Sequence, residues 1–179
     1  MRRAVFLDRD GVINRCVVRN GKPYAPQSAK DFRLLPRAAA AVKDLKAAGF
    51  LVIVVTNQPD IGNGLVDAAV VAAMHAKLAR LVAVDDIRTC PHRQNEYCGC
   101  RKPAAGLLLE AAAWWQIDPE KSFMVGDRWS DIVAGQAIGC YSIFLDRGYL
   151  ETRQITRRIV PDGRAKSLPA AVRLIRALA

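Results

Sequence analysis

Five short, continuous apolar runs constrain the fold of this chain more than any other feature of its sequence. Runs of this length, rich in β-branched residues, are typical of strands that are buried on both faces of a parallel sheet. Segments with the apolar spacing of helices separate these runs, so strand and helix alternate along the chain. The expected strands cover residues 4–7, 50–55, 87–89, 122–125 and 141–145.

Five helices are expected between and after these strands. Pro36 suits the first position of one helix and Gly49 its end. Asp67 suits the N-cap of the next helix, and Pro103 the first position of a third. The Met and Trp residues on these helices are expected in the core. The expected helices cover residues 36–48, 67–84, 103–115, 130–138 and 168–178.

This alternation predicts an α/β fold, a Rossmann-like three-layer sandwich with a mainly parallel central sheet. The chain has 179 residues, about the length of one domain, so we expect a single domain over residues 1–179. No long insert follows the first or second strand, so no separate cap domain is expected. Four segments are left without regular structure: residues 14–35, 59–65, 90–102 and 147–166.

Composition excludes several classes of protein. The longest apolar run, residues 49–55, is far shorter than the roughly 20 residues of a membrane span. The apolar stretch at the N-terminus is too short for a signal peptide, and an odd number of cysteines, 5, argues against a disulfide framework. We therefore expect a cytoplasmic protein. Its net charge of +10 attracts phosphates, nucleic acid or acidic partners, although a solvated basic face is the simpler explanation.

Carboxylates follow two of the expected strands at the point where each strand ends. Asp8 and Asp10 come directly after the first strand, and Asp127 follows the fourth. The carboxyl ends of parallel strands meet at one edge of a sheet, where ligands bind in such folds. Oxygen ligands of this kind suit Mg²⁺ with a substrate phosphate, and paired carboxylates can supply a nucleophile and a proton donor.

Groups suited to binding phosphate lie at the same edge. Thr56 ends the second strand and offers a hydroxyl beside free backbone N–H groups. Lys102 offers a point charge, and Arg101 a bidentate fork for a second anion. Asp131, shortly after Asp127, is placed to hold a metal-bound water, to orient a neighbour or to cap the following helix. Each signal is weak by itself, because polar turns and solvated basic pairs are common.

Taken together and in this order, the motifs resemble those of the haloacid dehalogenase superfamily of aspartyl phosphatases. The resemblance implies that Asp8 is the nucleophile and Asp10 the general acid/base. It also implies that Asp8, the backbone carbonyl of Asp10 and Asp127 bind Mg²⁺, while Thr56 and Lys102 hold the phosphoryl oxygens. The residues that carry the resemblance are Asp8-x-Asp10-Gly11, Thr56-Asn57, Lys102 and Gly126-Asp127-x-x-x-Asp131.

A compact cluster of metal-ligating residue types lies just before Arg101. Cys90, His92, Cys98 and Cys100 place four soft or borderline ligands within a short stretch of the chain. Four such ligands suit a closed tetrahedral Zn²⁺ site, which is structural rather than catalytic. Their spacing is tighter than that of most zinc fingers, and free thiols in a loop are the simpler alternative. We expect a zinc-stapled loop that orders the approach to Arg101 and Lys102.

This cysteine–histidine loop narrows the resemblance to the heptose bisphosphate phosphatase family, with the same loop shared by histidinol-phosphate phosphatases. The family removes the 7-phosphate from D-glycero-D-manno-heptose 1,7-bisphosphate, in the synthesis of nucleotide-activated heptose. The resemblance implies substrate contacts by Arg101 and Arg128, two cations beyond the lysine, which suit a second phosphate. Further substrate contacts are expected from Arg9, Asn57 and Gln58.

The sequence departs from this family at residues 59–64, which border the expected substrate site and leave the sugar and its anomer open. Substrate choice is expected to depend on the loops at 14–26, 59–65 and 90–102. Four alternatives stay open: a histidinol-phosphate phosphatase, another small-molecule phosphomonoesterase, a nucleic-acid 3′-phosphatase and a non-catalytic, zinc-stapled nucleic-acid-binding module. The last leaves the three carboxylates unexplained, and no aromatic platform for stacking bases is recognisable. We expect a monomer acting on a sugar phosphate, without nucleic-acid or membrane partners.

Overall fold

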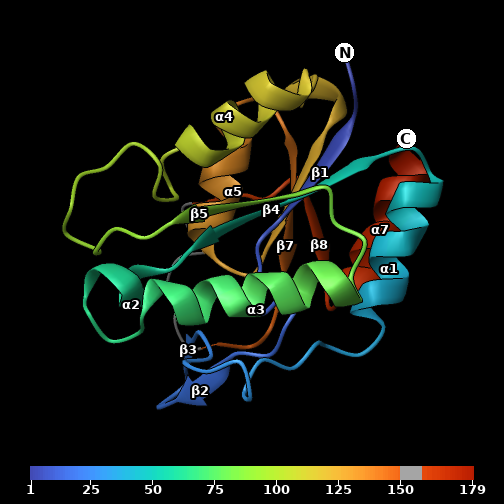
Figure 1. The fold of residues 1–179 in the computed structure, drawn as a ribbon. Coiled ribbons are helices and arrows are strands. Elements are labelled where there is room, and N and C mark those ends of the chain that lie inside the picture. The colour runs from blue at the N-terminus through green and yellow to red at the C-terminus, as the bar shows by residue number, and fades with distance from the viewer. Residues whose placement is uncertain (150–158) are drawn as a thin grey trace.

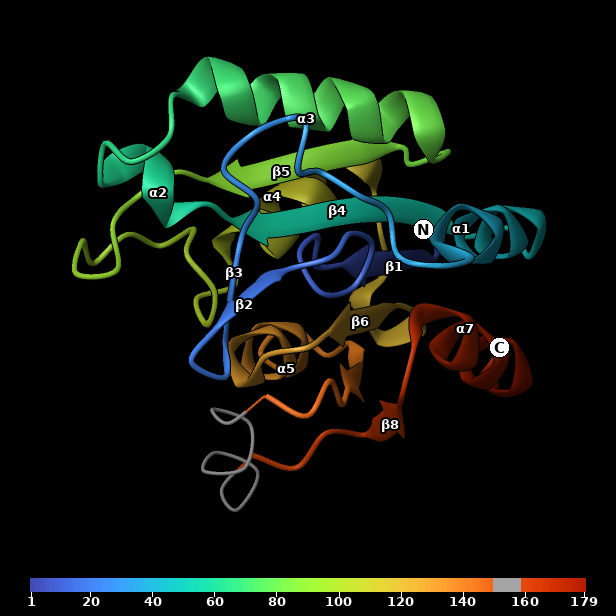
Figure 2. The same ribbon diagram turned by 90° about the horizontal axis from the view of Figure 1, so that it is seen from below.

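A computed structural model describes residues 1–149 and 159–179 of the chain (Figure 1). Its centre is a six-stranded sheet with the strand order β5-β4-β1-β6-β7-β8, in which every neighbouring pair is parallel. Figure 2 shows this order along the edge of the sheet. The strands are β1 (Ala4–Leu7), β4 (Leu51–Asn57), β5 (Asp86–Cys90), β6 (Phe123–Gly126), β7 (Tyr141–Leu145) and β8 (Gly163–Ala165).

Helices cover both faces of this sheet, as the three-layer prediction requires. Side chains of β1 alternate between two cores: Val5 and Leu7 pack with α1, α3 and α7, whereas Ala4 and Phe6 pack with α4 and α5. The expected Rossmann-like sandwich is thereby confirmed. The helices are α1 (Ala38–Ala47), α2 (Pro59–Gly62), α3 (Ala68–Leu81), α4 (Gly106–Trp115), α5 (Trp129–Gln136) and α7 (Leu168–Leu178), with a 3₁₀ turn at Pro119–Lys121.

A hairpin of β2 (Val17–Arg19) and β3 (Lys22–Tyr24) lies within the segment expected to be irregular. Asn20 and Gly21 at its tip have φ values of 51° and 73°. Two consecutive positive φ angles define the turn that suits the twist of a tight hairpin, and Asn-Gly is its strongest sequence signal. Within the described residues no separate cap domain is seen.

Other elements also differ from expectation. Strand β8 has no apolar run, because it is an edge strand that pairs only with β7. Helix α3 ends at Leu81, before the expected end at residue 84. Trp114 on α4 was expected in the core, but Trp114 is 74% exposed and Leu81 is 46% exposed, so neither side chain belongs to the core. Helix α4 begins at Gly106, not at Pro103, because the chain first makes a turn in which the N–H of Ala104 donates to Arg101 O. Part of the segment expected to be irregular at 147–166 lies outside the described residues. No described helix is both long and apolar enough to cross a membrane.

Candidate active site

Three adjacent strands deliver the expected site residues to one edge of the sheet. β1 lies between β4 and β6, and Leu7 is in register with both Val54 and Val125. The residues that follow these positions therefore leave the sheet side by side, which brings Asp8, Thr56 and Asp127 to the same place. The N–H of Asp8 continues the pairing by donating to Val125 O at 3.0 Å.

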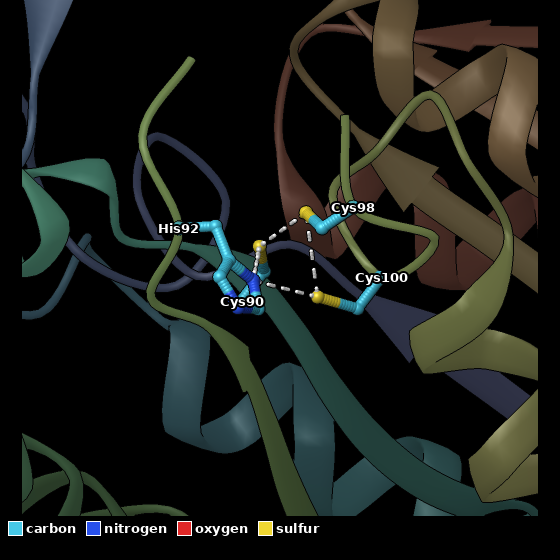
Figure 3. Close-up of side chains that lie close together, drawn as sticks. All are labelled: Cys90, His92, Cys98 and Cys100. Carbon is cyan, nitrogen blue, oxygen red and sulfur yellow. Dashed lines mark hydrogen bonds between the residues drawn. The ribbon is translucent and has the colours of Figure 1, made fainter. Parts of the chain in front are cut away.

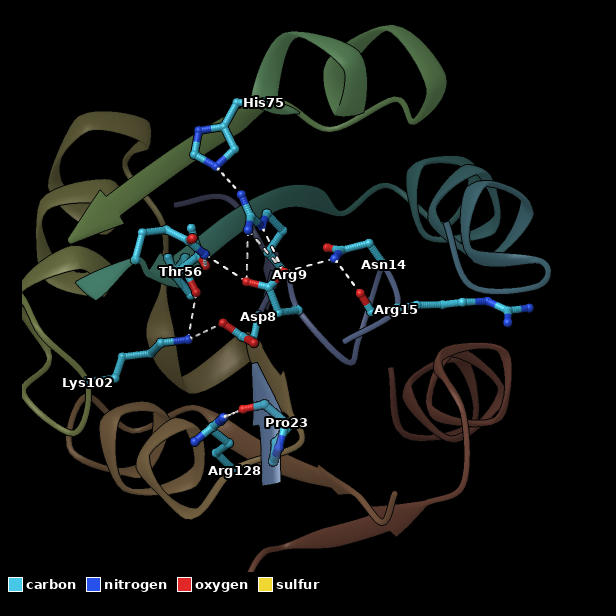
Figure 4. A network of polar contacts seen from close by, with 12 residues as sticks. Asp8, Arg9, Asn14, Arg15, Pro23, Thr56, His75, Lys102 and Arg128 are labelled. Carbon is cyan, nitrogen blue, oxygen red and sulfur yellow. Dashed lines mark hydrogen bonds and ion pairs between the residues drawn. The ribbon is translucent and has the colours of Figure 1, made fainter. Parts of the chain in front are cut away.

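Three carboxylates and one lysine form the centre of the site. Asp8, Asp127 and Asp131 each offer an oxygen atom, and these three atoms lie within 4.8 Å of one another. Lys102 Nζ lies 2.7 Å from Asp8 Oδ1 (Figure 4). It also lies 2.7 Å from Asp131 Oδ1 and donates to Val55 O at 2.6 Å. All four side chains are buried, so these charges interact with little solvent screening.

The centre carries more negative charge than its lysine balances. Burial raises the pKa of Asp8 to about 6, although Lys102 opposes this shift. Burial, together with the charges of Asp8 and Asp131, raises the pKa of Asp127 well above its usual value. Within the described part of the chain, both carboxylate oxygens of Asp127 are buried and accept no hydrogen bond. Unpartnered buried oxygens beside other carboxylates are the ligands that a divalent cation needs, so the residues present fit Mg²⁺.

Gly11 is required for this arrangement. Its φ of +82° lies in the left-handed region, and a Cβ atom added there would stand 1.8 Å from Asp127 Oδ2. The turn after β1 therefore brings its backbone against the unpartnered carboxylate at a distance that only glycine allows.

A separate set of donors holds the carboxyl group of Asp10. Arg9 Nη2 lies 3.0 Å from both of its oxygens, Asn14 Nδ2 2.8 Å from Oδ1, and Gln58 Nε2 2.7 Å from Oδ2. The side chain of Asp10 is thus not among the clustered metal ligands. Its expected metal contact was through the backbone carbonyl, which stays a prediction.

Three residues that we expected to contact substrate have partners inside the protein. The Arg9 side chain is 0% exposed, and its guanidinium is engaged by Asp10 and His75. The Asn57 amide group bonds to both the N–H and the carbonyl of Lys102, at 3.1 and 3.0 Å. Gln58 Nε2 donates to Thr56 Oγ1 at 2.8 Å as well as to Asp10. In this structure these side chains contact neighbouring groups of the site, and their expected contacts with substrate stay a prediction.

The two outer arginines differ from each other. Arg101 has a buried Nη1 atom that lacks a hydrogen-bond partner among the described residues. Arg128 donates from Nη2 to Pro23 O at 2.7 Å, which ties the β2–β3 hairpin to the start of α5 (Figure 4). The N–H of Arg128 donates to Asp131 Oδ2 at 3.0 Å, so Asp131 both caps α5 and orients Lys102.

The four expected zinc ligands come together, as Figure 3 shows. Cys98 Sγ lies 3.7 Å from the sulfurs of both Cys90 and Cys100, and His92 Nδ1 lies 3.5 Å from Cys90 Sγ and 3.2 Å from Cys100 Sγ. Zn–S bonds of about 2.3 Å in a tetrahedron separate two sulfurs by roughly 3.8 Å. The spacing of these four side chains therefore fits one tetrahedral Zn²⁺.

This cluster is attached to the active-site edge of the sheet. Gln58 N donates to Cys90 O at 2.8 Å, and Gly62 N donates to Pro91 O at 2.9 Å. The loop that carries the cluster then continues directly into Arg101 and Lys102. Two residues that the sequence analysis did not single out also belong to the site: Asn14, within an irregular segment, and His75, a lone histidine on α3. No local motif marks His75.

This fold and this site together define a class, the haloacid-dehalogenase-like hydrolases. A family model described as HAD-hydrolase-like matches residues 99–171. The chain is 40% identical over 153 residues to D-glycero-alpha-D-manno-heptose-1,7-bisphosphate 7-phosphatase of Mycobacterium bovis, covering 78% of this chain and 77% of that one. It is 35% identical over 150 residues to the corresponding beta-named enzyme of Rhodopseudomonas palustris, covering 77% of this chain and 80% of that one.

A solved structure points the same way. The D,D-heptose 1,7-bisphosphate phosphatase of Bordetella bronchiseptica, crystallised with magnesium and phosphate, superposes with a TM-score of 0.84 at 28% identity and covers 99% of each chain. The chain belongs to the family of D-glycero-D-manno-heptose-1,7-bisphosphate 7-phosphatases, whose members are phosphatases with a haloacid-dehalogenase-like fold.

Proposed function

We propose that this enzyme is a Mg²⁺-dependent phosphatase that hydrolyses the 7-phosphate of D-glycero-D-manno-heptose 1,7-bisphosphate, within the synthesis of nucleotide-activated heptose. The observation that carries the reaction type is the ion pair between Lys102 Nζ and Asp8 Oδ1, beside the unpartnered oxygens of Asp127. The names of the relatives support the substrate.

In this mechanism Asp8 attacks phosphorus and forms an aspartyl-phosphate, while the bond from phosphorus to the sugar oxygen breaks. Asp10 gives its proton to that leaving oxygen, so the sugar departs as a neutral alcohol. Asp10 then takes a proton from the water that attacks the aspartyl-phosphate, which releases inorganic phosphate and restores both carboxyl groups. The contacts to Arg9, Asn14 and Gln58 support this role, since they fix the carboxyl group of Asp10.

The remaining groups hold the phosphoryl oxygens and balance charge. Lys102 and Thr56 would bind two of these oxygens, with Lys102 fixed by Asp131 and by the amide group of Asn57. Phosphoryl transfer depends mainly on such positioning and charge stabilisation. Asp8, Asp127 and the backbone carbonyl of Asp10 would hold Mg²⁺. When bound, this ion neutralises charge on the carboxylates and on the transferred phosphoryl group.

The second phosphate of the substrate would lie against Arg101 and Arg128. The buried, unpartnered Nη1 atom of Arg101 supports this assignment. Zn²⁺ at Cys90, His92, Cys98 and Cys100 would keep their loop in place and take no part in the reaction. A zinc site of this type requires reduced thiols, which is consistent with a cytoplasmic location. We also propose that the enzyme is a monomer.

A comparison of substrates tests this function. We expect Mg²⁺-dependent phosphate release with the highest kcat/KM on one anomer of the heptose 1,7-bisphosphate. Both anomers must be tested, because some relatives are named for the alpha form and others for the beta form. Fructose 1,6-bisphosphate and histidinol phosphate are the comparison substrates. A higher kcat/KM on histidinol phosphate would contradict the proposed substrate and favour that alternative.

The matched control is Asp8→Asn, which keeps the shape of the side chain and removes its charge. It should lower kcat at least about 10³-fold on every substrate, a rise of roughly 4 kcal/mol in the barrier. Near-normal turnover by this variant would contradict covalent catalysis by Asp8.

A further inference from the structure

Arg9 is a fully buried cation one residue after Asp8. Its side chain is 0% exposed, and its guanidinium is always charged, so its burial requires close partners. One partner is the carboxyl group of Asp10, which receives hydrogen bonds from Nε at 3.3 Å and from Nη2 at 3.0 Å. The other partner is the ring of His75, whose Nε2 atom lies 3.0 Å from Arg9 Nη1 (Figure 4).

The direction of this second hydrogen bond follows from chemistry. A guanidinium group can only donate, so Nε2 of His75 must accept. The ring is therefore neutral and carries its proton on Nδ1. Burial and the charge of Arg9 lower the pKa of His75 to about 4, which is consistent with this form at neutral pH. His75 thus serves Arg9 as a fixed hydrogen-bond acceptor rather than as an acid or a base.

Geometry links this acceptor to the reacting group. Asn14 and Gln58 hold Asp10 from the turn after β1 and from the end of β4. Among the described residues, the hydrogen bonds of His75 on α3 lead to Asp10 through Arg9. The planar guanidinium presents one side to both carboxylate oxygens of Asp10 and another nitrogen to the imidazole ring. The hydrogen bond to His75 fixes Nη1 of Arg9, and with it the plane of the guanidinium group. That plane in turn orients the carboxyl group of Asp10.

We propose that His75 is a positioning residue for Asp10 and acts through Arg9, an inference that rests on the proposed function. A general acid must lie within hydrogen-bond reach of the leaving oxygen, and a displacement of about 1 Å lowers rates roughly 10²-fold. Loss of the acceptor at residue 75 lets the guanidinium turn, and the carboxyl group of Asp10 turns with it. Protonation of the leaving oxygen is the step that suffers.

Two substrates with different leaving groups reveal this step. The alkoxide that leaves from a heptose bisphosphate needs a proton, whereas p-nitrophenolate leaves readily without one. Replacing His75 by Leu should lower kcat/KM by about 10- to 100-fold on the heptose bisphosphate but less than about threefold on p-nitrophenyl phosphate. His75→Gln keeps an acceptor oxygen near the position of Nε2, and should bring the first value back to within about threefold of wild type.

Two further variants separate positioning from folding. His75→Asn is polar but too short to reach Arg9, so it should behave like the Leu variant. Lys77 on the same helix donates to the carbonyls of Ala29 and Phe32, at 2.9 and 3.0 Å, and has no contact with Arg9 or Asp10 among the described residues. Lys77→Met should lower Tm and leave the ratio of the two kcat/KM values unchanged. Both kcat/KM values are measured on the same preparation of a variant. The fraction of active enzyme therefore cancels from their ratio.

The outcomes are distinct. Equal losses on both esters in the Leu variant, or a Gln variant as defective as the Leu variant, would overturn the role of His75 alone. A wild-type enzyme without Mg²⁺-dependent turnover of either ester would overturn the proposed function and this inference together. A selective loss in the Leu and Asn variants with recovery in the Gln variant establishes the positioning role.

Discussion

Arg101 and Lys102 are neighbours in the chain, but their surroundings give them different tasks. Lys102 is ion-paired to Asp8 and Asp131, next to the reacting phosphorus of the proposed mechanism. Arg101 instead has a buried nitrogen with no hydrogen-bond partner in the described part of the chain. A charge that changes in the transition state affects kcat, whereas one that stays constant mainly affects KM.

We therefore expect Lys102→Ala to lower kcat on every phosphorylated substrate. Arg101→Ala should raise KM for the heptose bisphosphate by about 10- to 150-fold, the value of a buried bidentate contact, and should matter much less for a sugar monophosphate. Steady-state kinetics of both variants on both substrates measures this difference. Equal damage by Arg101→Ala to bisphosphate and monophosphate would show that Arg101 does not hold the second phosphate.

A matched arginine keeps this comparison specific. Arg88 forms an ion pair with Asp86 on β5, 2.8 Å away, and is not part of the carboxylate cluster. Arg88→Ala removes the same charge from the protein, so it should leave both KM values unchanged. A rise in KM in this variant would mean that net charge, and not the position of Arg101, controls binding.

Residues with a local motif could be predicted from the sequence, and residues that act across elements could not. Asp8 and Asp127 follow apolar strands, so topology alone brings them together. His75 is 66 residues away from Arg9 in the chain, and nothing near it in sequence marks a function. The burial of Arg9 is equally hard to predict, because its partner His75 lies far away in the sequence.

Among the elements, the zinc loop is the one that depends on a ligand. We expect about one Zn²⁺ per purified chain, because four ligands close one tetrahedral site. Cys98→Ser should lose the metal and loosen the approach to Arg101, so KM for the bisphosphate rises. Elemental analysis and kinetics check both effects. Cys140→Ala is the matched control, since Cys140 is buried outside the cluster and should keep the zinc.

Two results would contradict the zinc site. Protein prepared without chelators that contains no zinc would contradict the site. So would a Cys98→Ser variant that keeps its metal and its KM.

The contact between α3 and the turn after β1 makes stability depend on pH. The pKa of His75 is lowered from 6.5 to about 4 in the folded protein, so between these values the unfolded chain binds the extra proton. Stability should therefore fall as pH drops from about 6.5 to 4, by about 1–2 kcal/mol for this half-buried ring. Urea unfolding of wild type and His75→Gln across this range measures the difference in stability, which should stop changing with pH above about pH 7. A stability difference that does not change with pH would contradict this titration.

The strands and helices with strong apolar patterns were predicted well, and the elements without such patterns were missed. Helix α7 lies where its spacing predicts it, at Leu168–Leu178. Strand β8 and the β2–β3 hairpin have few buried side chains, so their pairing depends on backbone hydrogen bonds that apolar periodicity does not report. The Asn20-Gly21 turn is the one signal from which the hairpin could have been recognised.

At the scale of the whole molecule, strand order creates the site. Placing β1 between β4 and β6 brings residues from three distant segments to one edge, and the cysteine–histidine loop follows β5 at the same edge. The net charge of +10 adds a long-range attraction for a substrate with two phosphates. The enzyme must therefore distinguish the two phosphates of one molecule.

Phosphorus NMR of the reaction with D-glycero-D-manno-heptose 1,7-bisphosphate tests this requirement most directly. With Mg²⁺ present, the resonance of the 7-phosphate should disappear while inorganic phosphate appears and the 1-phosphate resonance persists. The same sample with Asp8→Asn, or with Mg²⁺ removed by a chelator, should show no change on that timescale. Loss of the 1-phosphate, or no hydrolysis of either anomer by the wild-type enzyme, would contradict the account.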